Sequence, residues 1–150
     1  MNFRYYLPVD LVFGRGAVSQ AGSLTAQYGK KALIVTGKGS TKKSGLLDKC
    51  VSLLKQAGVD SVVFDKVQQN PLTVTAEEGA KLACETGCDV VLGVGGGSTM
   101  DAAKGIAFLA ENQGDISDYI FARKTSDKAL PLILIPTTCG TGSEGNCFAV

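Results

Sequence analysis

The most informative stretch of this chain is Gly95-Gly96-Gly97-Ser98-Thr99-Met100-Asp101, which lies where an apolar strand ends and a helix begins. Residues 89–94 before it are mostly β-branched and apolar, as in a buried strand, and residues 102–110 after it show a helical pattern. Three successive glycines remove every Cβ that would hold a ligand away from the backbone. Because the N–H groups and dipole at a helix start favour a phosphate, the turn predicts nucleotide or dinucleotide binding.

Four short apolar runs alternate with helical segments along the chain. The runs are residues 32–35, 61–64, 90–92 and 132–135. A helix between the first two is expected to close at Gly58, and one between the second and third at Gly87. The second of these helices starts with Thr75-Ala76-Glu77-Glu78, which has the form of a capping box. The alternation predicts an α/β fold with a parallel sheet, right-handed crossovers and helices on both faces.

The two ends of the chain carry weaker patterns. Residues from Phe3 to Phe13 alternate loosely and predict a separate strand or hairpin, followed by a helix from about Ala17 to Tyr28. Near the other end, Asp115 to Ile120 is expected to form a short helix, and Arg123 to Lys128 a polar loop.

Composition places the chain among ordinary globular proteins. Its 150 residues are enough for one domain with a single core, and 45% are hydrophobic against 19% charged. A net charge of +1 gives no electrostatic reason to expect nucleic acid as a partner. No apolar run approaches the about 18 residues that span a bilayer, and the N-terminus lacks the apolar core of a signal peptide, so we expect a cytoplasmic protein without a membrane segment.

Cysteine and histidine narrow the possible chemistry. The cysteines are odd in number and lack the spacing of a disulfide scaffold, which favours reduced thiols packed as small hydrophobes; they are Cys50, Cys84, Cys88, Cys139 and Cys147. A metal or redox pair of Cys84 and Cys88 is the alternative. Histidine is absent, which excludes Ser-His-Asp and Cys-His catalysis from this chain alone.

Four polar segments follow the four predicted strands and are rich in Gly, Thr, Ser or Asn. They are residues 36–40, 68–71, 95–98 and 136–144. Ligands of parallel sheets bind at the carboxyl ends of the strands, so all four segments are expected on one rim, where a single extended ligand could touch them. The Gly-x-Gly-x-x-Gly fingerprint itself is incomplete, and there is no Walker A pattern.

Individual residues of this rim have competing interpretations. Ser98 is expected to cap the helix after the glycines, and Asp101 either orients the ligand or favours the helix start. The hydroxyls of residues 137–143 suit phosphate and ribose oxygens, or else satisfy their own turns. The candidate cofactor-binding residues are Gly37, Lys38, Ser40, Asn70, Gly95, Gly96, Gly97, Ser98, Thr99, Asp101, Thr137, Thr138, Thr141 and Ser143.

Gly37 bears on the choice between two cofactors. It stands where nucleotide-binding sheets often place an acidic residue for the adenosine ribose 2′-hydroxyl. A glycine leaves room for a 2′-phosphate, with which Lys38, Lys42 or Lys43 could pair, although these lysines could equally form a solvated loop. The pattern favours NADP over NAD.

Taken together, the motifs resemble the N-terminal half of the iron-containing (group III) alcohol dehydrogenases, a family related to glycerol dehydrogenase and dehydroquinate synthase. The resemblance runs through nearly the whole chain. Its segments are residues 12–16, 33–40, 43–47, 95–98, 101–104, 136–138 and 140–144. Two places depart from the family pattern: Gln69-Asn70-Pro71 replaces Pro-Asn-Pro, and Gly145-Asn146-Cys147 replaces part of a short apolar and Thr-containing strand.

The resemblance implies a two-domain enzyme that transfers hydride between a primary alcohol or aldehyde and NAD(P). Residues 1–150 would be the Rossmann-like cofactor-binding domain, and a helical C-terminal domain, absent from this chain, would bind a divalent metal, iron or zinc. By motif position, Gly96, Gly97 and Ser98 would hold the pyrophosphate. Thr137, Thr138 and Thr141 would line the nicotinamide side, with Asn70 and Gly37 near the adenosine.

The resemblance assigns no catalytic or metal-binding residue to this chain, which is therefore expected to be inactive alone. Dimerisation through residues 3–12 is a further implication of the resemblance. Two alternatives stay open on the sequence. One is a fragment of a glycerol dehydrogenase-like or dehydroquinate synthase-like enzyme. The other is a stand-alone nucleotide-binding module without catalysis.

Overall fold

Four parallel strands form the centre of the molecule, in the order β2-β1-β3-β4. The computed structural model describes residues 2–4, 6–112, 114–120, 123–147 and 149. The strands are β1 (Lys31–Gly37), β2 (Asp60–Val67), β3 (Val90–Gly95) and β4 (Leu132–Pro136). Each contains one of the four apolar runs, and all three strand pairs are parallel, which confirms the predicted α/β fold.

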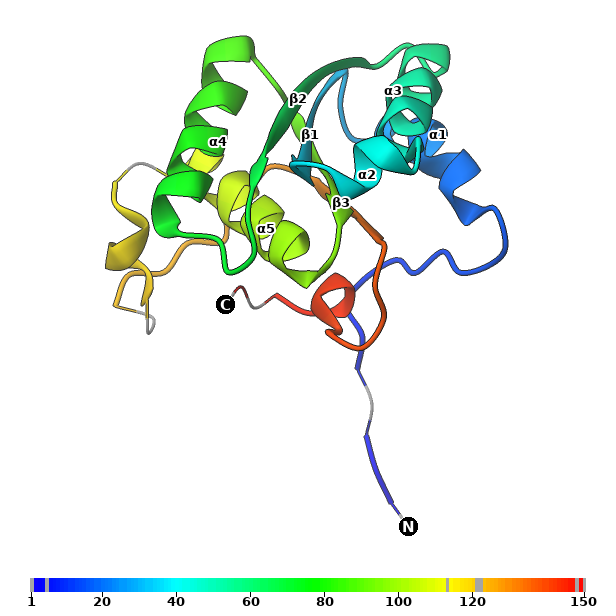
Figure 1. Ribbon diagram of the computed structural model, residues 1–150. Helices are drawn as coiled ribbons and strands as arrows, with labels where there is room; N and C mark the ends of the chain where they lie inside the picture. The colour runs from blue at the N-terminus through cyan, green and yellow to red at the C-terminus, as the bar shows by residue number, and fades with distance from the viewer. Residues whose placement is uncertain (1, 5, 113, 121–122, 148, 150) are drawn as a thin grey trace.

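Helices connect the strands and cover both faces of the sheet (Figure 1). The α-helices are α1 (Ala21–Thr25), α2 (Ser40–Lys43), α3 (Leu46–Gln56), α4 (Thr73–Thr86) and α5 (Gly97–Glu111). Short 3-10 helices are η1 (Ala17–Gln20), η2 (Ile116–Asp118) and η4 (Ser143–Gly145). The sheet lies between α4 and α5 on one side and α1 and α3 on the other.

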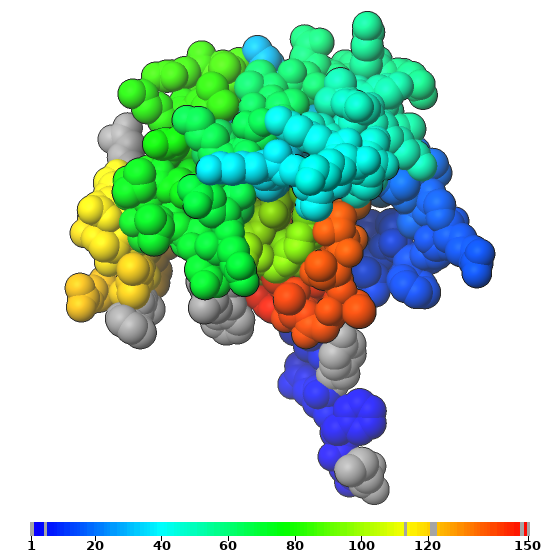
Figure 2. Space-filling model, in the orientation of Figure 1, coloured from blue at the N-terminus to red at the C-terminus, as the bar shows by residue number. Residues whose placement is uncertain are grey.

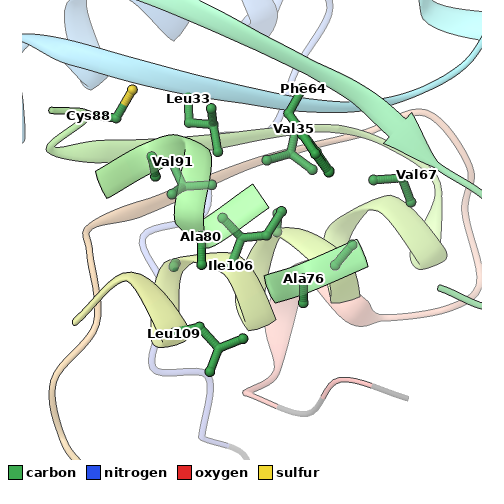
Figure 3. Close-up of a cluster of buried hydrophobic side chains, with 14 residues drawn as sticks. Leu33, Val35, Phe64, Val67, Ala76, Ala80, Cys88, Val91, Ile106 and Leu109 are labelled. Carbon is green, nitrogen blue, oxygen red and sulfur yellow. The ribbon is translucent and has the colours of Figure 1, made fainter. Parts of the chain in front are cut away.

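Two hydrophobic clusters, one on each face, fix this sandwich. Leu33 and Val35 of β1 pack with Ile106 of α5 in the first cluster (Figure 3). Ile34 of the same strand packs with Leu54 of α3 in the second. Successive side chains of a strand point to opposite faces, so an uninterrupted apolar strand such as β1 serves both clusters.

The predicted helix ends are confirmed at two glycines. Gly87 follows α4 with φ 67° and Gly58 follows α3 with φ 73°, the left-handed conformation that glycine adopts at low cost. The capping box is wrong, because α4 begins at Thr73 and Leu72 precedes it as the N-cap. Thr75 therefore lies inside the first turn, where its backbone N–H donates to the Leu72 carbonyl.

The N-terminal prediction is also wrong. None of the described residues between Phe3 and Phe13 belongs to a strand; Tyr5 lies outside the described residues. Only the N-terminal end of the segment projects away from the body of the molecule (Figure 1), whereas Tyr6, Pro8 and Val9 line a hollow with Gly145 and Asn146. Phe3 and Phe13 are 84% and 95% exposed. Loose alternation supplies an amphipathic pattern but no neighbouring strand to accept its backbone hydrogen bonds. The expected helix over 17–28 is two short pieces, η1 and α1.

The segment before β4 contains little regular structure. Of the short helix expected over residues 115–120, the structure contains η2. Asp115 is its N-cap, and the Asp115 carboxylate accepts a 2.8 Å hydrogen bond from the Ser117 backbone N–H. Residues 123–128 form a loop, as predicted. Within the described parts of the chain, no helix is long and apolar enough to cross a membrane.

Candidate functional site

The carboxyl ends of the four strands meet at one rim of the sheet. Gly37 pairs with Val67 at the ends of β1 and β2, and Gly95 pairs with Pro136 at the ends of β3 and β4. In Figure 2 the cyan, green and orange segments that follow β1, β2 and β4 border the yellow-green surface at the start of α5. The four polar segments therefore do converge, as the sequence predicts.

The glycine turn, residues 95–97, packs against the threonine loop, residues 137–142. A Cβ on Gly97 would lie 2.9 Å from Thr141 Cγ2, and one on Gly96 would lie 3.2 Å from Thr138 Oγ1. A backbone bond of 2.9 Å from the Thr137 N–H to the Gly95 carbonyl joins the two segments. Much of the room that the glycines provide is thus taken by the threonines, which lie against the start of α5.

Ser98 has a different role from the predicted cap. Gly96 is the N-cap of α5, with φ −82° and ψ −174°, and Ser98 lies within the first helical turn. Its Oγ accepts a 3.4 Å hydrogen bond from the backbone N–H of Asn70, whose φ is 52°. Ser98 therefore ties the loop after β2 to the helix that follows β3. The first N–H groups of α5 have no acceptor within the helix, which leaves donors at the rim.

Asp101 takes part in a side-chain network that neither of its two interpretations anticipated. Its Oδ1 accepts a 2.6 Å bond from the Ser143 hydroxyl and lies 3.4 Å from Lys104 Nζ. Lys104 also donates to Ser143 Oγ at 2.7 Å and to Asn146 Oδ1 at 3.1 Å. Sequence reasoning missed Lys104 and Asn146, although the three-residue spacing of Asp101 and Lys104 places both on one helix face.

The candidate hydroxyls divide into exposed and buried groups. Thr137, Thr138 and Thr141 are exposed at the rim. Ser143 is 4% exposed and bonded to Asp101 and Lys104, and Thr99 is 7% exposed beneath Gly95. The first group is in a position to meet a ligand, whereas the second supports the shape of the site.

The rim beside Gly37 combines cations with a carboxylate. Lys42 forms an ion pair with Asp65 of β2, and this contact holds the pKa of Asp65 below its ordinary value. Lys38, Ser40 and Lys43 are exposed on the same rim. Thr36 and Thr41, two residues that sequence reasoning did not select, share a buried 2.6 Å hydrogen bond that anchors α2 to the end of β1.

Cysteines and carboxylates do not assemble a metal centre in the described part of the chain. No group of three or more His, Cys, Asp or Glu side chains there could hold a metal ion. All five cysteines are free; Cys50 and Cys88 are buried, and burial raises the pKa of both thiols. The expectation of packed thiols is wrong for Cys84, Cys139 and Cys147, which are exposed.

The parallel sheet and its helices define a Rossmann-like α/β chain. Its sequence matches the model of the family described as iron-containing alcohol dehydrogenase over residues 8–150. The chain therefore belongs to the iron-containing alcohol dehydrogenase family.

Relatives of known name agree with this assignment. NADH-dependent butanol dehydrogenase B of Clostridium acetobutylicum is 37% identical over 150 residues, which are 100% of this chain and 38% of that protein. The 1,3-propanediol dehydrogenase of Citrobacter freundii is 38% identical over 144 residues, covering 95% of this chain and 37% of its own. The chain thus spans about two fifths of the length of the relatives it matches.

Solved structures share the fold at similar identity. The archaeal Red Sea brine pool alcohol dehydrogenase ADH/D1, bound to NZQ, superposes with a TM-score of 0.91 at 40% identity, covering 100% of this chain and 40% of that one. Sulfoacetaldehyde reductase of Bifidobacterium kashiwanohense in complex with NAD⁺ superposes with a TM-score of 0.87 at 32% identity. The match covers 98% of this chain and 39% of the reductase chain.

Proposed function

We propose that this chain is the cofactor-binding domain of a metal-dependent alcohol dehydrogenase that interconverts small primary alcohols and aldehydes with NAD(P). The observation that carries the proposal is the junction of the glycine turn with the threonine loop at the start of α5. Family membership and the names of the relatives support the oxidoreductase class. The nicotinamide, when bound, would exchange a hydride with the substrate carbon.

The residues of the turn fit a dinucleotide pyrophosphate. Backbone N–H groups of Gly97 and Ser98 belong to the first turn of α5, where the helix dipole favours negative charge. Gly96 and Gly97 carry no Cβ, so these donors are flanked only by the exposed Thr138 and Thr141 side chains, beside which a phosphate oxygen would reach them. The exposed Thr138 and Thr141 hydroxyls lie beside them and would orient the nicotinamide half of the cofactor.

The rim beside Gly37 supports NADP as the preferred cofactor. Gly37 offers no carboxylate to the adenosine ribose, and Lys38 and Lys43 supply cations there. Asn70, held in place by its backbone bond to Ser98, would lie near the adenosine. Some relatives carry NADH in their names, so the choice is to be measured directly on this chain.

A metal fits poorly among the residues described here, since they offer no three-ligand group. We place the iron or zinc, and most of the substrate pocket, in a helical C-terminal domain of a longer polypeptide. A homodimer and a cytoplasmic location remain predictions of the same account. The chain alone should bind cofactor without oxidising alcohols.

The test is a fluorescence titration of the 150-residue chain with NADPH and NADH, together with an alcohol oxidation assay. We expect saturable binding, tighter for NADPH, and no turnover. Absence of binding for both nucleotides would contradict the proposal. Turnover by the isolated chain would support an enzyme complete in itself and refute the placement of the metal elsewhere.

A further inference from the structure

Lys104 lies in the second turn of α5 and is surrounded by oxygen atoms. Its side chain is 9% exposed and that of Asp101 is 15% exposed, so the pair is largely shielded from water. Ser143, from the short helix η4, lies between them and is 4% exposed. Removing one buried charge from such a set leaves its hydrogen-bond partners unsatisfied. The resulting loss of stability is larger than the loss caused by breaking an exposed ion pair.

The hydrogen bonds of this network have a defined direction. The Lys104 ammonium donates to Ser143 Oγ at 2.7 Å, and the Ser143 hydroxyl donates its single proton to Asp101 Oδ1 at 2.6 Å. A methionine at 104 has no donor for the first bond, and an amide at 101 accepts the second less strongly than a carboxylate does. The Lys104 ammonium and the Asp101 carboxylate therefore both contribute to holding Ser143.

Ser143 connects the network to the threonine loop. Its backbone N–H donates to Thr141 Oγ1 at 3.3 Å, and Thr141 is the residue whose methyl lies over Gly97. A second connection runs from Lys104 to Asn146, whose side-chain N–H donates to the Gly142 carbonyl at 2.9 Å. Two routes thus join α5 to Thr141 and Gly142, at the C-terminal end of the loop that lies against the start of the same helix.

We propose that Lys104 and Asp101 are positioning residues, which act through Ser143 to hold the threonine loop in place for the nicotinamide half of the cofactor. The inference rests on the proposed function. The pyrophosphate donors belong to α5 itself and do not depend on the loop, whereas Thr138 and Thr141 do. Loosening the network should therefore weaken contacts to one half of the dinucleotide and spare the other half.

The experiment compares Lys104→Met and Ser143→Ala with the unmodified chain, and with Lys81→Met as a matched control. Lys81 pairs with Glu85 on the exposed surface of α4 and touches none of these residues. Two ligands are titrated: NADPH, and 2′-phospho-ADP-ribose, which is the same molecule without nicotinamide. Hydrogen exchange of the ligand-free chain reports separately on the order of residues 137–146.

We expect both variants to weaken NADPH binding about tenfold, to change binding of 2′-phospho-ADP-ribose by less than about twofold, and to speed exchange in 137–146 only. Equal losses for both ligands would overturn the proposal, because they indicate a general structural defect. Unchanged NADPH binding would also overturn it. If the unmodified chain binds neither ligand, the proposed function fails, and unchanged exchange would then refute the network separately.

Discussion

At Gly97, a hydrogen atom in place of a side chain lets two parts of the site touch. The methyl of an alanine there would lie 2.9 Å from Thr141 Cγ2 and 3.2 Å from Thr141 Cβ. Contacts that short require the Thr141 side chain to shift or rotate, and an added methyl in a packed position costs about 1–3 kcal/mol.

Gly97→Ala is therefore expected to weaken NADPH binding about tenfold while the chain stays folded. Alanine favours the helix, so the global fold should not suffer. The double variant Gly97→Ala with Thr141→Ser removes the clashing methyl and keeps the hydroxyl, and should recover part of the affinity. Equal affinity of Gly97→Ala and the unmodified chain, measured by titration, would refute this packing argument.

Asp65 sets the charge of the rim near the predicted 2′-phosphate. It binds Lys42, and both side chains are over two fifths exposed, at 41% and 46%. An exposed ion pair contributes about 0.2–1 kcal/mol to stability, so breaking the Lys42–Asp65 pair should change the stability of the fold little. Asp65→Asn should free Lys42 and raise the ratio of NADPH to NADH affinity about threefold at low salt. A ratio that is unchanged, or that falls, would argue against a phosphate at this rim.

At the scale of elements, α1 and α3 approach each other closely at Gly22. A Cβ on Gly22 would lie 2.2 Å from the backbone oxygen of Leu53, a group that cannot rotate away. Gly22→Ala should lower the free energy of unfolding by about 2 kcal/mol, despite the helix propensity gained. Urea denaturation measures the effect, with exposed Ser23→Ala in the same helix as the control; a stabilised Gly22→Ala variant would contradict the helix contact.

Asp89 joins the starts of β3 and β1 at the opposite rim. Burial raises its pKa, but the backbone N–H groups of Lys30 and Lys31, at 2.8–2.9 Å, outweigh it and hold the pKa below its ordinary value. Because the pKa of Asp89 is lower in the folded state, its carboxylate stabilises the fold at pH values above the unfolded-state pKa of about 3.9. This stabilisation is lost as the pH falls through the folded-state pKa.

Asp89→Asn should thus cost about 1 kcal/mol at pH 7, because the exposed site screens the charge. The difference from the unmodified chain should shrink as the pH falls below about 4. Thermal or urea unfolding across pH 3–7 measures this, and a constant difference over that range would show that the carboxylate charge is not the cause.

Strands and the converging rim were predictable because they depend on local apolar runs and on the geometry of parallel sheets. The capping box at Thr75 and the cap at Ser98 failed because short motifs do not specify which residue begins a helix. The network of Lys104 with Ser143 spans 39 residues, and nothing local in the sequence pairs these two side chains. The described residues before Phe13 show the converse, since alternation without a partner strand gave no strand there.

In the molecule as a whole, we expect the rim formed by the glycine turn and the threonine loop to bind a dinucleotide. Isothermal titration of the 150-residue chain with NADPH, run beside the Gly97→Ala variant, tests it most directly. We predict one binding site per chain, with affinity about tenfold weaker in the variant. No heat of binding with the unmodified chain, or equal affinity in both proteins, would contradict the claim.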